Sequence, residues 1–167
     1  VFTPEMLEEI NAQIDFLCGL RFTREELQYL RSIRFIKDDY VEFLRLWHPI
    51  REYVHTGLSP QGELILTVKG PMFSAMQFEI YLLEIVNEVY FRMHYDYAQL
   101  EASARQRLEQ KIRDFNSGKY TFRFAEFGCR RRLSRQWQDE VVRRLSQETT
   151  NCAGTSNVYL AMKYDLT

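Results

Sequence analysis

The chain has 167 residues, of which 46% are apolar and 14% aromatic, with only 7 glycines and 4 prolines. This composition excludes an intrinsically disordered chain and a fibrous repeat, and the length is enough for one self-sufficient core. Because 22 basic and 23 acidic side chains leave a net charge of -1, a protein that binds mainly nucleic acid is also disfavoured.

The first 34 residues predict two helices. Thr3 followed by Pro4 is typical of a helix start, and apolar residues then recur at helical spacing until Gly19. Thr23 and Glu26 have the spacing of a capping box, in which each side chain accepts a backbone N–H of the other residue. A second helix is therefore expected from there to about residue 34.

A third helix and a hairpin are expected next. Asp38 or Asp39 would cap the helix, and Pro49 would end it. Residues 53–55 and 63–69 predict two strands, because a turn rich in Gly and Pro separates them and the second alternates with period two.

Residues 76–95 predict a long helix that is apolar almost all round. Such a helix must be covered on most sides, which a larger protein or an oligomer provides more easily than a monomer of this size. Its charged residues argue against a membrane span: Glu79, Glu84, Glu88 and Arg92. A more polar helix is expected over residues 97–115, before a turn that contains Gly118.

After Gly118 the pattern becomes strand, helix, strand, helix, over residues 120–127, 133–148, 151–157 and 158–164. This order implies parallel strands joined by a crossover, as in an α/β fold. We therefore expect an N-terminal α+β helical domain with a hairpin over 1–118, and the start of an α/β domain over 119–167. Two parallel strands are not a stable sheet alone, so the chain is expected to be a piece of a longer protein.

Arg130, Arg131 and Arg132 lie between the first of these strands and the following helix. Guanidinium groups beside the N-terminal amides of a helix attract anions, and their planar shape suits a phosphate or a carboxylate. Gly128 is expected to let the backbone turn sharply, and Phe127 could present its ring face to a flat heterocycle. A solvated run of charge explains the arginines equally well.

The segment 151–157 is expected to end in a polar loop formed by Gly154, Thr155, Ser156 and Asn157. Because parallel strands end at one edge of their sheet, this loop is expected beside the arginines, where open α/β sheets and barrels bind ligands. Its hydroxyl and N–H groups would form a neutral hydrogen-bonding surface. A plain capping turn into the last helix is at least as good an explanation.

No complete catalytic machinery is recognisable in the sequence. The histidines are His48, His55 and His94, which have neither metal-site spacing nor an obvious nucleophile partner. The cysteines are Cys18, Cys129 and Cys152, which form no CxxC pair and are expected to be reduced thiols of a cytosolic protein. We assign no catalytic residue and no metal ligand.

Two motifs together resemble the bacterial nicotinate phosphoribosyltransferase family. They are Ala125-Glu-Phe-Gly-Cys-Arg-Arg-Arg-Leu-Ser134 and Ala153-Gly-Thr-Ser-Asn-Val-Tyr-Leu-Ala161. The predicted helices from Phe22 to Trp47, the strand at 63–70 and the long helix also fit, so the resemblance covers essentially the whole chain. It implies an α+β domain joined to an incomplete, TIM-like α/β barrel of the type II phosphoribosyltransferases.

The resemblance also implies a reaction. Nicotinate would displace pyrophosphate from phosphoribosyl pyrophosphate and give nicotinate mononucleotide, in the salvage route to NAD. The family couples this step to ATP hydrolysis through a phosphorylated histidine, with Mg2+ on the phosphates. A cytoplasmic homodimer is implied, with no nucleic acid and no membrane as partner.

Three residues would bind the pyridine base by this resemblance. Phe127 would stack on the ring, and Arg130 would bind the ring substituent or a phosphate. Ser156 lies where relatives that use the amide carry an aspartate. A hydroxyl can donate to the nicotinate carboxylate, whereas a buried aspartate would repel it, so the serine favours the acid.

The remaining site residues are Thr155, assigned to substrate binding, and Arg131 and Arg132, assigned to phosphate binding. The family's N-terminal segment has no match here, and the loop with the phosphorylated histidine would follow Thr167. We therefore expect an internal fragment that lacks most of the barrel and is inactive by itself.

Alternative functions remain open at this point. A nicotinamide phosphoribosyltransferase-like enzyme would share the fold, although Ser156 argues against it. A non-catalytic α+β module could bind phosphate or nucleic acid through Arg130 to Arg135, and such binding would weaken steeply with salt. A structural interaction domain without a ligand would carry the arginines only as surface charge.

Overall fold

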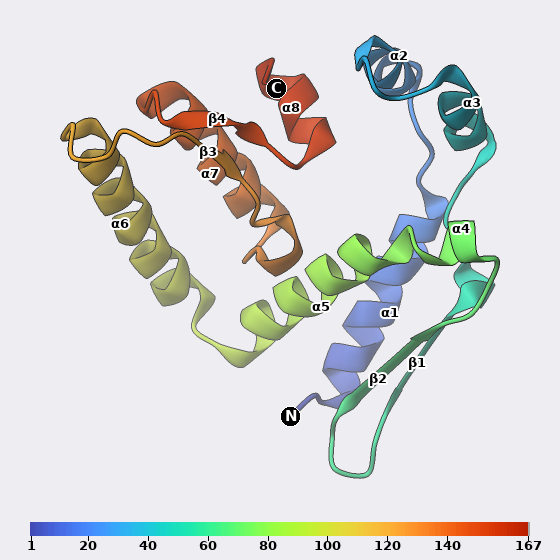
Figure 1. Cartoon of the computed structure of the whole chain (residues 1–167). Helices are drawn as coiled ribbons and strands as arrows, with labels where there is room; N and C mark the ends of the chain where they lie inside the picture. The colour runs from blue at the N-terminus through green and yellow to red at the C-terminus, as the bar shows by residue number, and fades with distance from the viewer. Residues whose placement is uncertain (167) are drawn as a thin grey trace. The chain divides into compact units, whose positions relative to one another are not determined.

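The computed structural model describes residues 1–166, and its contacts form two compact units, Val1–Val89 and Tyr90–Thr167. Figure 1 shows the elements of both units in the order of the chain. In the described chain, no helix is both long and apolar enough to cross a membrane. Each unit has its own apolar core, so each is described by itself.

The first unit contains helices, a hairpin and a short 3-10 turn. Its elements are α1 (Pro4–Gly19), α2 (Arg24–Ser32), α3 (Asp38–Leu46), η1 (Arg51–Tyr53), β1 (Val54–Leu58), β2 (Leu64–Val68), α4 (Met72–Ala75) and the start of α5 (Phe78–His94). The inner face of α1 packs against Val54 and against Phe78 and Leu82 of α5. The short helix α4 was not expected from the sequence.

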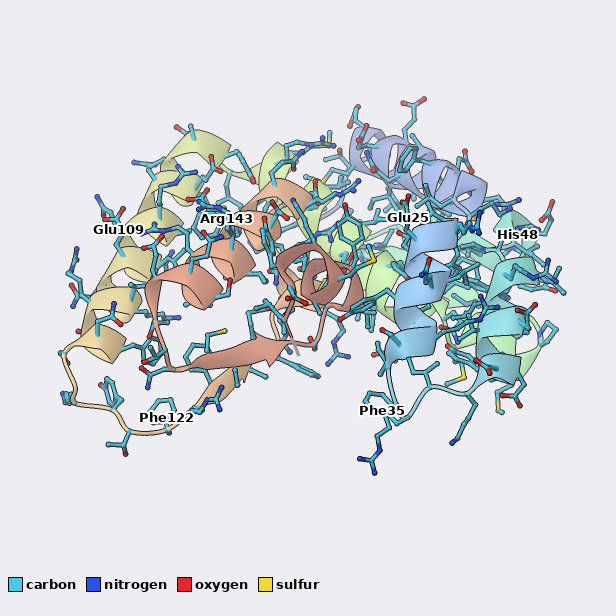
Figure 2. The ribbon with its side chains drawn as sticks, turned by 90° about the horizontal axis from the view of Figure 1, so that it is seen from above. Glu25, Phe35, His48, Glu109, Phe122 and Arg143 are labelled. Atoms are coloured by element: carbon cyan, nitrogen blue, oxygen red, sulfur yellow. The ribbon has the colours of Figure 1, made fainter. Side chains whose placement is uncertain are left out.

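Helices α2 and α3 share a smaller core of Leu27, Leu30, Val41 and Leu44. The turn between them exposes Phe35, whose side chain is 83% accessible and projects away from both helices (Figure 2). His48, just after α3, places Nδ1 3.1 Å from the Pro49 carbonyl oxygen (Figure 2). This contact is local, as expected for a histidine outside a metal site.

The predicted caps of the first two helices are confirmed. Thr3 accepts the Met6 N–H at 3.3 Å, and Thr23 and Glu26 form both bonds of the capping box, at 3.2 and 2.7 Å. The expected aspartate cap of α3 is wrong. The N-cap is Lys37, which makes no side-chain capping bond.

The two aspartates of α3 instead occupy its first turn. Negative side chains in that position are favoured by the positive end of the helix dipole. Asp39 also accepts the N–H of Tyr40 at 2.9 Å. The acidic pair therefore stabilises the helix start without being the cap.

The hairpin is antiparallel, with His55 opposite Thr67 and Gly57 opposite Ile65. The first strand ends three residues later than expected, at Leu58, because Gly57 pairs within the sheet rather than starting the turn. The turn glycine is Gly62, whose φ of 75° lies in the left-handed region that glycine adopts without strain.

The second unit contains the end of α5, then α6 (Tyr97–Asn116), β3 (Phe124–Glu126), η2 (Cys129–Arg131), α7 (Arg135–Glu148), β4 (Cys152–Thr155) and α8 (Val158–Tyr164). Strands β3 and β4 pair in parallel, as predicted, with α7 as the crossover (Figure 1). Leu108 and Ile112 of α6 pack against Trp137 and Leu145 of α7. Strand β3 is shorter than the expected 120–127.

Helix α6, expected in the first domain, thus packs within the second unit. The start of the catalytic domain at residue 119 stays a prediction. Thr167, the last residue of that predicted domain, lies outside the described residues.

An ion pair joins α6 to α7 and has a consequence for stability at low pH. Arg105 binds both oxygens of Glu140, with Nε–Oε1 and Nη2–Oε2 distances of 3.1 and 2.8 Å. The bond from Arg105 holds the pKa of the Glu140 carboxyl below its usual range. A lowered folded-state pKa stabilises the fold above the unfolded pKa, and this contribution disappears as the pH falls through the folded-state pKa.

Replacing Glu140 by glutamine should therefore lower the thermal midpoint near neutral pH, and this difference should shrink as the pH falls below about 4 and vanish below the folded-state pKa of Glu140. Thermal melts of the two proteins across this range measure the difference. Glu8→Gln, at an exposed site on α1, is the control for loss of one carboxylate. If the difference in thermal midpoint between wild type and Glu140→Gln stays constant with pH, the pKa of Glu140 is not lowered by the ion pair.

Candidate active site at the ends of β3 and β4

The two polar loops meet where the paired strands end. Glu126 lies opposite Thr155 in the parallel register, so Phe127 and Ser156 each come directly after the paired residues. The Ser156 N–H donates to the Glu126 carbonyl oxygen at 2.9 Å. The expectation that the loops lie side by side is confirmed.

Glu126 ties these loops together, a role that was not predicted from the sequence. Its side chain is buried, with 8% of the residue accessible. One carboxylate oxygen accepts the Gly128 N–H, and the other accepts the Thr155 hydroxyl at 2.9 Å. The only signal in the sequence was an acidic residue within a short apolar strand, which also fits an exposed position.

Gly128 is needed for space rather than for its backbone freedom. The chain turns here, as expected, but the φ of -96° and ψ of 0° are open to any residue, so the turn does not require glycine. A Cβ at this position would lie 2.7 Å from Glu126 Oε1. The glycine therefore leaves room for the buried carboxylate.

Asn157 adds a second link between the loops. Its amide Nδ2 lies 3.0 Å from Cys129 Sγ, and its backbone N–H donates to the Thr155 hydroxyl oxygen at 3.2 Å. The Asn157 side chain also accepts the Leu160 N–H at 3.0 Å and so caps α8. The capping interpretation of this loop is confirmed, and the cap lies within the inter-loop contact.

The structure brings most of the predicted base-binding residues to one edge. Phe127 is 77% accessible, and Arg130 and Ser156 are also exposed. Thr155 is buried, and its hydroxyl already donates to Glu126 and accepts from Asn157. A direct contact of any of these residues with a substrate stays a prediction.

The predicted phosphate-binding arginines lie in and after the turn η2. Arg131 is exposed and Arg132 half-buried. Helix α7 begins at Arg135 rather than at Leu133, because Ser134 is its N-cap and accepts the Trp137 N–H at 3.0 Å. The arginines are therefore up to five residues before the helix, in a turn that places cations next to the exposed edge.

The thiols and the acidic side chains of the site do not resemble a nucleophile or a metal centre. Burial raises the pKa of the Cys152 thiol, which disfavours the thiolate. Among the described residues, no cysteine forms a disulfide. Within residues 1–166, no group of three or more His, Cys, Asp or Glu side chains could hold a metal ion. The arrangement places an aromatic ring, guanidinium groups and a serine hydroxyl at one exposed edge.

Comparison with known proteins identifies the family. Residues 2–87 match the family model described as nicotinate phosphoribosyltransferase (NAPRTase) N-terminal domain, and residues 122–167 match that of the nicotinate phosphoribosyltransferase (NAPRTase) family. The chain belongs to the nicotinate phosphoribosyltransferase family.

Relatives in this family are similar over nearly the whole chain. The nicotinate phosphoribosyltransferase of Chromobacterium violaceum is 43% identical over 173 residues, which cover 98% of this chain and 42% of the relative. The nicotinate phosphoribosyltransferase of Bordetella petrii is 46% identical over 167 residues, which cover 96% of this chain and 42% of the relative. The chain thus spans well under half the length of these relatives.

Solved structures of the family agree with the fold. The nicotinate phosphoribosyltransferase of Porphyromonas gingivalis superposes with a TM-score of 0.81 at 29% identity, over 99% of this chain and 42% of that one. The structure of the Vibrio cholerae nicotinate phosphoribosyltransferase superposes with a TM-score of 0.80 at 27% identity, over 97% of this chain and 40% of that one. The expected fold class, an N-terminal α+β domain followed by the first part of the family's α/β barrel, is confirmed.

Proposed function

We propose that the protein containing this chain is a nicotinate phosphoribosyltransferase. It would join the ring nitrogen of nicotinate to C1 of phosphoribosyl pyrophosphate, while the bond from C1 to the pyrophosphate oxygen breaks and pyrophosphate leaves with the electron pair. The observation that supports this most is the convergence of the family's two motifs at the ends of β3 and β4, with Ser156 bonded to Glu126.

The proposed roles follow from the position of each side chain. Phe127 would stack on the pyridine ring, because it is exposed at the end of β3. Arg130, in the adjacent turn, would bind the carboxylate of the ring or a phosphate. The reaction needs little covalent chemistry from these residues, so their contribution would be positioning and charge stabilisation.

Three further residues have secondary proposed roles. Arg131 and Arg132 would stabilise the phosphate groups, since both lie in or just after η2. Thr155 would contribute to substrate binding through its position beside Ser156. We assign no residue of this chain to Mg2+, since no group of metal-ligating side chains gathers among residues 1–166.

Ser156 is proposed to select the acid over the amide. Ser156→Asp should lower kcat/KM for nicotinate at least about tenfold, because its carboxylate would face that of the ligand, and should raise it for nicotinamide, whose amide can donate. Parallel kinetics with both bases measure the ratio. Ser156→Ala, which removes the hydroxyl without adding charge, should weaken nicotinate binding without inverting the preference.

The proposed function is tested on the whole protein. Purified enzyme is supplied with phosphoribosyl pyrophosphate, ATP and Mg2+, and is given nicotinate or nicotinamide. Nicotinate mononucleotide as the main product supports the proposal, and a preference for nicotinamide supports the alternative enzyme. If neither nucleotide forms, the proposal is wrong and the non-catalytic anion-binding module is the better interpretation.

We infer further that the reaction is coupled to ATP hydrolysis and that the protein is a cytoplasmic homodimer in NAD salvage, as the family resemblance implies. The exposed apolar side chains of Ile80 and Leu83 on α5 support the proposal that a second copy of the protein packs against this helix. Omission of ATP tests the coupling, and sedimentation of the same preparation tests the homodimer. The chain alone is proposed to be inactive.

A further inference from the structure

We propose that Glu126 is the positioning residue of this site and fixes the spacing between the two substrate-binding loops. The proposal rests on the proposed function for its kinetic consequences, but not for its geometry. The bonds of Glu126 to Gly128, Thr155 and Ser156 are called here the inter-loop network. Glu126 itself would not touch the substrate.

The inter-loop network uses both carboxylate oxygens and the carbonyl oxygen of Glu126 as acceptors. Its carboxylate holds Gly128 on its own loop and, at 2.9 Å, the hydroxyl of Thr155 on the other. Its carbonyl oxygen accepts the Ser156 N–H, also at 2.9 Å. One residue therefore fixes both the main chain and the side chain of the second loop relative to the first.

The network explains why a carboxylate is present although its burial is unfavourable. A buried charge costs free energy unless it is fully hydrogen-bonded. A carboxylate only accepts, and the Gly128 N–H can only donate. The Thr155 hydroxyl accepts the Asn157 N–H and donates its own proton to Glu126. A glutamine here would place an N–H group against one of these donors.

The network is coupled to the proposed base-binding residues by the alternation of the strands. Side chains of successive residues point to opposite faces, so Glu126 and Thr155 face inward while Phe127 and Ser156 come next on the exposed side. A change in the spacing of Glu126 and Thr155 therefore moves the aromatic ring relative to the serine hydroxyl. Base binding should be affected more than phosphoribosyl binding.

The test uses the whole enzyme with Thr155→Val, which keeps the shape of the side chain and removes only its hydroxyl. The KM for nicotinate should rise about tenfold, the usual effect of losing a hydrogen bond to a buried charge. The KM for phosphoribosyl pyrophosphate should stay within about twofold. Glu126→Gln should give the same pattern, and Thr155→Ser should restore most of the nicotinate affinity because it keeps the hydroxyl.

A stability control separates positioning from general damage. Val142→Ala truncates a fully buried side chain of α7 in the same unit and should destabilise without changing the ratio of the two KM values. If Val142→Ala changes that ratio as much as Thr155→Val, or if Thr155→Val leaves it unchanged, the proposal is wrong.

Amide hydrogen exchange tests the inter-loop network without a measurement of enzyme activity. Residues 127–132 and the Ser156 amide should exchange faster in Thr155→Val than in wild type, and no faster in Thr155→Ser. If the wild-type enzyme makes no nicotinate mononucleotide, the proposed function fails while this comparison still tests the network. Unchanged exchange in Thr155→Val would overturn the positioning role of Glu126.

Discussion

Replacing Arg130 by alanine should lower kcat/KM for nicotinate about 10²-fold or more. The guanidinium lies at the exposed edge, in the turn η2 between β3 and α7. Each hydrogen bond to a charged group contributes about 1.5–3 kcal/mol, and a planar guanidinium can form two of them with one carboxylate or phosphate. Loss of both corresponds to a rate factor of about 10² to 10⁴. Steady-state kinetics of the whole enzyme measure it.

Two variants make this result specific to Arg130. Arg143→Ala removes an exposed arginine of α7 whose side chain contacts Gln147, outside both loops, and should leave kcat/KM near the wild-type value (Figure 2). Arg130→Lys keeps the charge but loses the planar pair of donors, so an intermediate loss is expected. Equal activity of Arg130→Ala and Arg143→Ala would mean that the arginine is only surface charge.

Local patterns predicted the elements best where the interaction is itself local. The capping box at Thr23 involves residues three apart, so the sequence contains all of its information. The same holds for Asn157, whose side chain caps α8. The aspartates of α3 failed as caps because an acidic residue is favourable both as the cap and in the first turn, and the sequence does not separate these two positions.

The position of the candidate site was predictable for a topological reason. A strand, helix and strand in succession imply a parallel pair, and parallel strands end at the same edge. This argument needs only the order of the elements. It placed the arginine turn beside the loop at Ser156 without any knowledge of side-chain contacts.

The inter-loop network could not be predicted in this way, because it depends on the register of β3 and β4. A shift by one residue would move Glu126 to the opposite face and away from Thr155. The strands are short, and their pairing is irregular between Phe124 and Ala125. Alternation along the sequence therefore did not determine which residues face each other.

Gly128→Ala is expected to disrupt the network from the opposite side. The backbone at this position suits alanine, so the added Cβ has one effect, a contact of 2.7 Å with Glu126 Oε1. Displacing the carboxylate weakens its bonds to both loops at once. We therefore expect a larger loss than for Thr155→Val, about 10²-fold in kcat/KM for nicotinate.

A second substitution should relieve this loss. Glu126→Asp withdraws the carboxylate by one methylene, and an aspartate readily accepts the N–H two residues ahead, which here belongs to position 128. Alone, Glu126→Asp should impair nicotinate binding, because the shorter side chain no longer reaches the Thr155 hydroxyl. The double variant Glu126→Asp/Gly128→Ala should have a kcat/KM for nicotinate at least about tenfold higher than that of Gly128→Ala alone. The new methyl group would then occupy the space that the shorter side chain leaves.

The kinetics of the two single variants and the double variant form a double-mutant cycle. Losses that simply add would show that the methyl group and the carboxylate do not compete for the same space. Losses that partly cancel would show that they do. Because neither side chain is expected to touch the substrate, cancellation in kcat/KM reports the spacing of the loops: the Gly128 turn and the loop at Ser156 would then be set by the one carboxylate between them.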